Sequence, residues 1–146
     1  MNDSGRGKHR MQKNKDLGEA LISVVDDDSL MRSSTRRLLI AEGFRVEAFA
    51  SAEEFLASVM AEETACLILD LRMPGMNGLE LQRRLAGDFN PVPIVFLSAH
   101  ASADDERRAL QAGAIEFLQK PVNKNVLLLA IHNALKTPPD DKRKIL

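Results

Sequence analysis

The sequence predicts an α/β fold, in which a doubly wound, five-stranded parallel sheet carries five helices on its two faces. One observation is a series of short, almost continuous apolar runs that end abruptly in polar residues, as strands buried on both faces do. A second is the helical pattern after each run, so that strand and helix alternate five times. No residue pattern repeats at that period, which excludes a solenoid. Right-handed crossovers join such units, and we expect the strand order 2-1-3-4-5.

The first two strand–helix units span residues 20–60. The run ALISVV predicts a strand over 20–25, followed by a helix over 29–42. The alternating run FRVEAFA predicts a weaker strand over 44–50. Ser51 and Glu54 form a capping-box pattern, so that the second helix is expected over 51–60.

The remaining three units continue the alternation. The runs ACLIL, PIVFL and AIEFL predict strands, and Gly113 is a stop signal for the helix that precedes the last of them. The expected strands are 65–69, 93–97 and 114–118, and the expected helices are 78–86, 102–112 and 123–135.

The chain is long enough for one domain and its charges nearly balance. Its 146 residues include 20 Lys and Arg against 21 Asp and Glu, which gives a net charge of −1. This balance argues against a protein whose dedicated role is to coat nucleic acid. We expect a disordered basic tail over 1–17, the domain over 18–137, and a short tail or linker start over 138–146. A single cysteine excludes an internal disulfide, and apolar runs of about six residues are far shorter than the ~20 that span a bilayer. The N-terminus also lacks the apolar core of a secretion signal, so we expect a soluble, cytoplasmic protein.

Polar side chains stand at the carboxyl ends of four predicted strands. They are Asp26, Asp27 and Asp28 after the first strand, Asp70 after the third, Ser98 after the fourth and Lys120 after the fifth. In this strand order the first and third strands are neighbours, and ligands bind at this edge of the sheet. Two carboxylates ~4 Å apart repel by about 4 kcal/mol at an effective dielectric near 20, so the acidic cluster requires a cation. Oxygen ligands with room for water favour Mg²⁺, and the sequence offers no His/Cys cluster that zinc would prefer.

A magnesium ion beside Asp70 predicts phosphoryl transfer onto its carboxylate. The metal ion would neutralise charge on the phosphoryl oxygens, while Lys120 and the hydroxyl of Ser98 would hold the remaining oxygens. The aspartates after the first strand have a second interpretation, as helix caps that interact with the helix dipole. We assign that role to Asp28, because the polar residues at the other strand ends favour metal binding for Asp26 and Asp27.

Four motifs surround these strand ends: VVDDD at 24–28, LDLRMPGMNGLEL at 69–81, FLSAH at 96–100 and FLQKP at 117–121. Over residues 20–137 the chain resembles the receiver domain of two-component response regulators, most closely receivers of the FixJ/NarL type. The resemblance implies a flavodoxin-like fold and a phosphoacceptor at Asp70. It implies a metal site made of Asp26, Asp27, Asp70 and the backbone carbonyl of Arg72. It also implies that Ser98 and Phe117 are switch residues, that Lys120 contacts the phosphoryl group, and that the bond before Pro121 is cis.

The resemblance also implies partners. A sensor histidine kinase or a phosphotransfer protein would supply the phosphoryl group, and an effector protein would read the result. A phosphorylation-dependent homodimer through the fourth helix, the fifth strand and the fifth helix is implied as well. Such a domain assists its own phosphorylation and dephosphorylation and is not otherwise an enzyme. We expect no contact with membranes. We also expect no direct contact with nucleic acid, because the segment after Leu135 is too short for a helix-turn-helix.

The sequence departs from the receiver pattern at two positions. Ser98 stands where Thr is common and lacks its methyl group, and Phe117 replaces a frequent Tyr and lacks its hydroxyl. By the same resemblance, Arg72 and His100 flank the water that attacks the phosphorylated state.

Our leading hypothesis is a single-domain receiver, and five alternatives stay open. The chain would instead act as an intermediate of a phosphorelay. The chain would serve as the receiver of a longer FixJ-like transcription factor if Pro138 and Pro139 begin a linker. A metal-dependent phosphatase with an aspartyl-phosphate intermediate needs a second acid two residues after its nucleophile, where this chain has Arg72. A flavodoxin-like nucleotide binder would have its phosphate repelled by the three aspartates. The basic tail allows a weak, salt-sensitive contact with nucleic acid.

Other residues are assigned to packing. Cys66 is expected in the core and His100 and His132 at the surface, while Gly75 and Gly78 are expected to shape a turn. The six apolar residues from 126 to 131 cover every side of a helix, of which one face can lie on the sheet. We expect Leu127, Ile131 and Leu135 to face the core. Val126, Leu128 or Leu129 would then form an exposed apolar patch for a dimer or an effector, and the alternative is that the chain termini cover this face.

Overall fold

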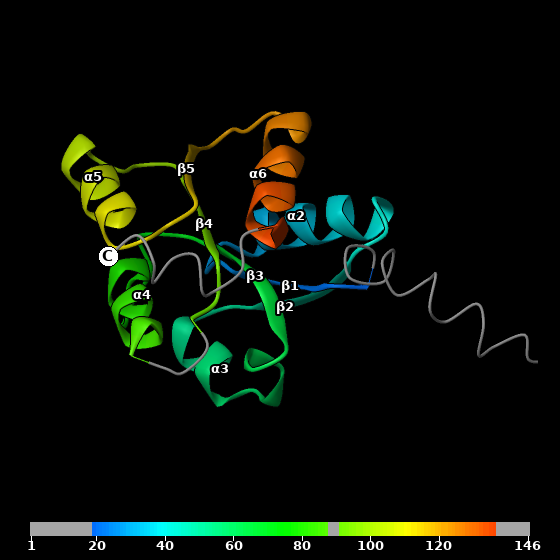
Figure 1. Cartoon of the computed structure of the whole chain (residues 1–146), viewed down its shortest axis with the longest axis horizontal. Coiled ribbons are helices and arrows are strands. Elements are labelled where there is room, and N and C mark those ends of the chain that lie inside the picture. The colour runs from blue at the N-terminus through cyan, green and yellow to red at the C-terminus, as the bar shows by residue number, and fades with distance from the viewer. Residues whose placement is uncertain (1–18, 88–90, 137–146) are drawn as a thin grey trace, which may run out of the picture.

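The computed structural model describes residues 19–87 and 91–136. Its centre is a five-stranded parallel sheet with the order β2-β1-β3-β4-β5, which confirms the predicted topology (Figure 1). The strands are β1 (Leu21–Val25), β2 (Arg45–Phe49), β3 (Thr64–Leu69), β4 (Ile94–Ser98) and β5 (Glu116–Gln119). The tail expected over 1–17 and the segment 138–146 lie outside the described residues.

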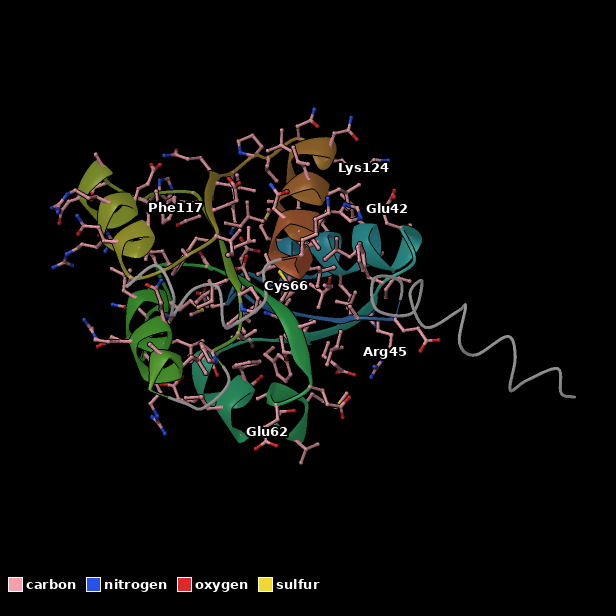
Figure 2. All side chains as sticks on the ribbon, viewed as in Figure 1. Glu42, Arg45, Glu62, Cys66, Phe117 and Lys124 are labelled. Carbon is pink, nitrogen blue, oxygen red and sulfur yellow. The ribbon has the colours of Figure 1, made fainter. Side chains whose placement is uncertain are left out.

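The α-helices cover both faces of the sheet. Within the described residues they are α2 (Ser29–Ala41), α3 (Ala52–Ala57), α4 (Gly78–Ala86), α5 (Ala103–Gln111) and α6 (Lys124–Lys136). Figure 1 shows α3, α4 and α5 on one side of the sheet and α2 and α6 on the other. On the second side an ion pair links α6 to the end of α2, with the Nζ atom of Lys124 3.4 Å from Oε2 of Glu42 (Figure 2).

Two apolar clusters, one on each face of the sheet, form the core. Successive residues of a strand point to opposite faces, so Leu67 and Leu69 of β3 pack with α3, α4 and α5, whereas Cys66 and Ile68 pack with α2 and α6. Cys66 has no exposed surface, which confirms its expected place in the core (Figure 2). β1 is buried along its whole length, as the near-continuous apolar run predicts for a central parallel strand.

Local hydrogen bonds decide where several helices begin and end. Asp28 caps α2 as predicted, because its side chain accepts from the amides of Leu30 and Met31. Ser51 caps α3 as predicted, but Glu54 reaches back to the amide of Ala50. The prediction of one helix over 51–60 is wrong.

The break in that helix lies at Ser58. Its backbone is extended, and its hydroxyl accepts from the amide of Met60, so that α3 ends at Ala57 and a 3₁₀ turn, η1, covers Val59–Ala61. Serine competes with helical hydrogen bonding in this way, and the spacing of apolar residues does not report it.

The last helix carries the predicted division of apolar residues. Leu127 and Ile131 are buried and Leu135 packs against the same cluster, whereas Val126 and Leu129 are exposed and Leu128 is partly buried. His132, expected at the surface, is half-buried with its ring 6.1 Å from that of Phe44, while His100 is exposed as predicted. Over residues 19–87 and 91–136, no helix has the length and apolar character required to cross a bilayer.

Candidate functional site

The strand order brings the predicted acidic residues together. β1 and β3 are paired with Val25 opposite Leu69, so Asp26 and Asp70 leave the sheet side by side. The amide of Asp70 donates to the carbonyl of Val25 at 2.9 Å, which fixes this register at the strand ends. Carboxylate oxygens of Asp26, Asp27 and Asp70 all lie within 4.8 Å of one another. The structure therefore confirms the predicted convergence of these three side chains.

Lys120 enters the same cluster from the other half of the sheet. Its backbone amide donates to the carbonyl of Ser98 at 2.9 Å, which places it at the end of β5 beside β4. Its Nζ atom donates to Oδ2 of Asp26 at 2.8 Å and lies 4.0 Å from Oδ2 of Asp70. The Lys120 side chain is 10% exposed, so this cation neutralises part of the negative charge in a sheltered site. The bond between Lys120 and Pro121 is cis, as expected.

The environment of Asp70 disfavours its charged form. Burial raises the pKa of Asp70 to about 6, and the negative charge of Asp26 acts in the same direction. Lys120 and the amide of Leu71, which donates to Oδ1 of Asp70 at 2.8 Å, oppose this rise. The ionised carboxylate is thus held at a higher free energy than it would have in water, a condition that a nearby cation relieves.

The donor set fits a magnesium ion. It consists of carboxylate oxygens, of which those of Asp27 are exposed and those of Asp26 and Asp70 are sheltered, so that waters can complete the coordination. Among the described residues this is the acidic group that could hold an ion, and it contains neither His nor Cys. The expected fourth ligand, the carbonyl of Arg72, stays a prediction.

Of the two expected switch residues, Ser98 ends β4, and Phe117 lies within β5 opposite Phe96. Ser98 is 1% exposed, and its Oγ atom has no hydrogen-bond partner among the described residues. A buried hydroxyl without a partner is costly, so the Ser98 hydroxyl gains free energy from any group that accepts its hydrogen bond. Phe117 is buried, stacks on Phe96 with 5.4 Å between ring centroids, and lies between the sheet and α5 (Figure 2).

The loop after Asp70 depends on two glycines for different reasons. Gly75 has a φ angle of +75°, which confirms its predicted role in a turn. Gly78 does not occupy such a conformation. A Cβ atom there would lie 2.4 Å from the carbonyl oxygen of Asp70, so this glycine permits α4 to begin directly against the backbone of Asp70. The prediction that Gly78 shapes a turn is therefore wrong.

Sequence reasoning missed three side chains that hold the site from outside. Arg32 of α2 donates from Nη1 to the carbonyl of Asp26 at 2.8 Å. Glu53 of α3 accepts from the amide of Met76 at 3.0 Å, an interaction that lowers the pKa of Glu53 and attaches the loop after Asp70 to α3. Asp105 of α5 accepts from Arg72. Each contact joins segments that are distant in the chain or separated by a turn, and no local pattern marks it.

Comparison with known proteins identifies relatives of this arrangement. The sequence model of the response regulator receiver domain matches residues 22–132. Response regulator protein TmoT of Ectopseudomonas mendocina is 43% identical over 124 residues, which cover 85% of this chain and 56% of TmoT. Nodulation protein W of Bradyrhizobium diazoefficiens is 40% identical over 140 residues, which cover 96% of this chain and 59% of that protein. The chain thus spans a little over half the length of these curated relatives.

Solved structures show the same fold. The crystal structure of FixJ-N has a TM-score of 0.74 and 34% sequence identity, and the match covers 81% of this chain and 94% of that one.

Proposed function

Because the chain belongs to the response regulator receiver domain family, we propose that it accepts a phosphoryl group on Asp70 from a sensor histidine kinase or a phosphotransfer protein. One observation carries this proposal: Asp70 has a raised pKa, sits among Asp26, Asp27 and Lys120, and belongs to the same strand-end site as a buried hydroxyl without a partner. A sheltered carboxylate with a raised pKa, placed beside other charged groups, is typical of a functional site.

In the proposed reaction, a carboxylate oxygen of Asp70 attacks the phosphorus atom of a phosphohistidine. The new O–P bond forms as the P–N bond breaks, and the imidazole nitrogen keeps the electron pair. Asp26, Asp27, Asp70 and the carbonyl of Arg72 would hold Mg²⁺, which when bound neutralises negative charge on the phosphoryl oxygens. Oδ2 is the acceptor atom that we assign, because Oδ1 already accepts from the amide of Leu71.

Two further residues would bind the phosphoryl group. Lys120 lies with Nζ 4.0 Å from Oδ2 of Asp70, close enough to contact a phosphoryl oxygen after a small movement. The Ser98 hydroxyl would donate to another oxygen and so obtain the hydrogen bond that it lacks. Movement of Ser98 would then be transmitted through Phe117 to a protein-binding surface on α5, β5 and α6, which an effector or a second copy of the chain would read.

Phosphorylation by a small donor tests this function. Protein incubated with Mg²⁺ and phosphoramidate should gain the mass of one phosphoryl group, and Asp70→Asn should abolish the gain. Asp104→Asn, which removes an exposed carboxylate of α5, should leave the gain unchanged. Full labelling of the Asp70→Asn variant would show that another residue is the acceptor.

A second candidate is the same receiver acting within a longer transcription regulator. It is favoured by Transcriptional regulatory protein FixJ of Bradyrhizobium diazoefficiens, 36% identical over 115 residues that cover 79% of this chain and 56% of FixJ. In either case we place the protein in the cytoplasm, as a signalling domain instead of an enzyme. The phosphatase alternative gains no support, since Arg72 stands where it needs an acid.

A further inference from the structure

An ion pair joins the loop after Asp70 to the beginning of α5. Nη2 of Arg72 lies 2.5 Å from Oδ2 of Asp105, although the two residues are 33 positions apart. The Arg72 side chain is 61% exposed and that of Asp105 is 12% exposed. The aspartate is therefore the fixed partner, and the arginine is the partner that can leave.

Asp105 is fixed because it belongs to the cap of α5. Its Oδ2 atom also accepts from the amide of Ser102 at 3.1 Å, while its own amide donates to the hydroxyl of Ser102 at 3.0 Å. Residues 99–102 link this cap to Ser98, the hydroxyl that is expected to move toward a phosphoryl group. The ion pair thus connects the acceptor loop to the far end of the loop that follows Ser98.

The Arg72 guanidinium is also within reach of a group on Asp70. Asp70 and Arg72 are two positions apart, so their Cα atoms lie at most about 7 Å from one another, which is about the length of an arginine side chain. A phosphoryl group carries up to two negative charges and three acceptor oxygens, and the planar guanidinium binds it in bidentate fashion. A carboxylate with one charge would then compete for Arg72 with a group of higher charge.

Building on the proposed function, we propose that Asp105 is a positioning residue that holds the Arg72 guanidinium on α5 while Asp70 is free, and that a phosphoryl group on Asp70 draws this guanidinium away. The transfer of Arg72 releases the first turn of α5 from the acceptor loop as Ser98 turns toward the phosphoryl group. Asp105 therefore opposes phosphorylation and keeps the surface of α5 in its resting arrangement.

The substitution Asp105→Asn tests this role while keeping the cap, since an amide oxygen can still accept from Ser102. The probe is beryllium trifluoride with Mg²⁺, a phosphoryl mimic, and affinity is measured by calorimetry because the chain has no Trp and no Tyr for intrinsic fluorescence. Asp105→Asn should bind the mimic up to about fivefold more tightly, the range expected for loss of a partly exposed ion pair. The matched control is Asp104→Asn in the same helical turn, where Arg107 and Arg108 are the partners, and it should change nothing.

A double substitution separates positioning from simple loss of charge. In the Arg72→Ala background, Asp105→Asn should have no effect on the affinity, because no guanidinium remains to be released. In the metal-free protein, Asp105→Asn should also speed amide hydrogen exchange over residues 99–105.

Three outcomes distinguish the hypotheses. Unchanged affinity in Asp105→Asn, or the same gain in both backgrounds, would overturn the role of Asp105. If the unsubstituted protein fails to bind the mimic at all, the proposed function itself is wrong. Unchanged exchange over 99–105 would show that the ion pair does not restrain the start of α5.

Discussion

The Nζ atom of Lys120 lies 2.8 Å from Oδ2 of Asp26, although 94 positions separate the two residues in the chain. Both side chains are at most 10% exposed, so the pair is sheltered from water. Parallel pairing of β1, β3, β4 and β5 brings it about, since all four strands end at one edge of the sheet. The cation compensates part of the charge of three carboxylates.

Removal of the cation should destabilise the metal-free protein. Lys120→Ala leaves the acidic cluster uncompensated, and loss of one partner of a buried pair costs about 3 kcal/mol of the free energy of unfolding. Urea unfolding without Mg²⁺ measures this cost, and added Mg²⁺ should recover much of it. The control is Lys124→Ala, whose side chain is 55% exposed and whose pair with Glu42 should contribute less than about 1 kcal/mol. An equal decrease in the free energy of unfolding in the two variants would contradict the idea that burial makes the Lys120–Asp26 pair the more stabilising one.

Removal of the acceptor carboxylate should stabilise the metal-free protein. The pKa of Asp70 is raised to about 6, so its ionised form is less favourable in the folded than in the unfolded chain. Asp70→Asn should therefore increase the free energy of unfolding by about 1–2 kcal/mol at pH 7.5.

The sign of this effect with pH follows from proton uptake. Below pH 6 the folded protein protonates Asp70 before the unfolded chain does, so that the original protein gains stability relative to Asp70→Asn. The advantage of the variant should disappear by about pH 4, near the ordinary pKa of the group. An advantage that persists at low pH would exclude ionisation as its cause.

The three consecutive aspartates should differ in magnesium binding. Asp26→Asn and Asp27→Asn each remove a carboxylate from the cluster and should weaken Mg²⁺ affinity by at least about tenfold, since an ion pair at this range contributes several kcal/mol at an effective dielectric near 20. Asp28→Asn is the matched control, because its side chain caps α2 and asparagine caps equally well. Calorimetric titration compares the three variants. If Asp28→Asn weakened Mg²⁺ binding as much as Asp26→Asn and Asp27→Asn do, the metal site would not be the one assigned to Asp26 and Asp27.

Close packing at Gly78, the first residue of α4, predicts a stability difference from Gly87, the residue that caps the other end of this helix. Gly78→Ala places a methyl group against the carbonyl of Asp70 and the ring of Phe96 and should cost about 1–3 kcal/mol. Gly87→Ala is the control, since among the described residues its added carbon would meet only the carbonyl oxygen of Arg84, at 3.6 Å. Thermal unfolding compares the two variants, and similar midpoints would show that the start of α4 can shift.

Much of the fold follows from local patterns. Buried parallel strands require continuous apolar runs, and polar residues must follow where a strand leaves the sheet, so the ends at Asp26, Asp70 and Ser98 are visible in the sequence. Asp28 and Ser51 are equally visible as caps, because capping involves residues two or three positions apart. The break at Ser58 was not predicted. The hydroxyl of Ser58 accepts from the amide of Met60, and this local hydrogen bond competes with those of a continuous helix without leaving a mark in the apolar pattern.

By itself, the sequence determined which side chains could carry out the chemistry and at which edge of the sheet they would gather. Tertiary structure decided how they are held: Lys120 against Asp26, Arg72 on Asp105, Glu53 on the loop after Asp70, and Gly78 against its backbone. The physical reason is the range of the interactions. Periodicity and capping act between near neighbours in the chain. These contacts, in contrast, require that elements distant in the chain are positioned to within a few tenths of an ångström, and only packing positions them so.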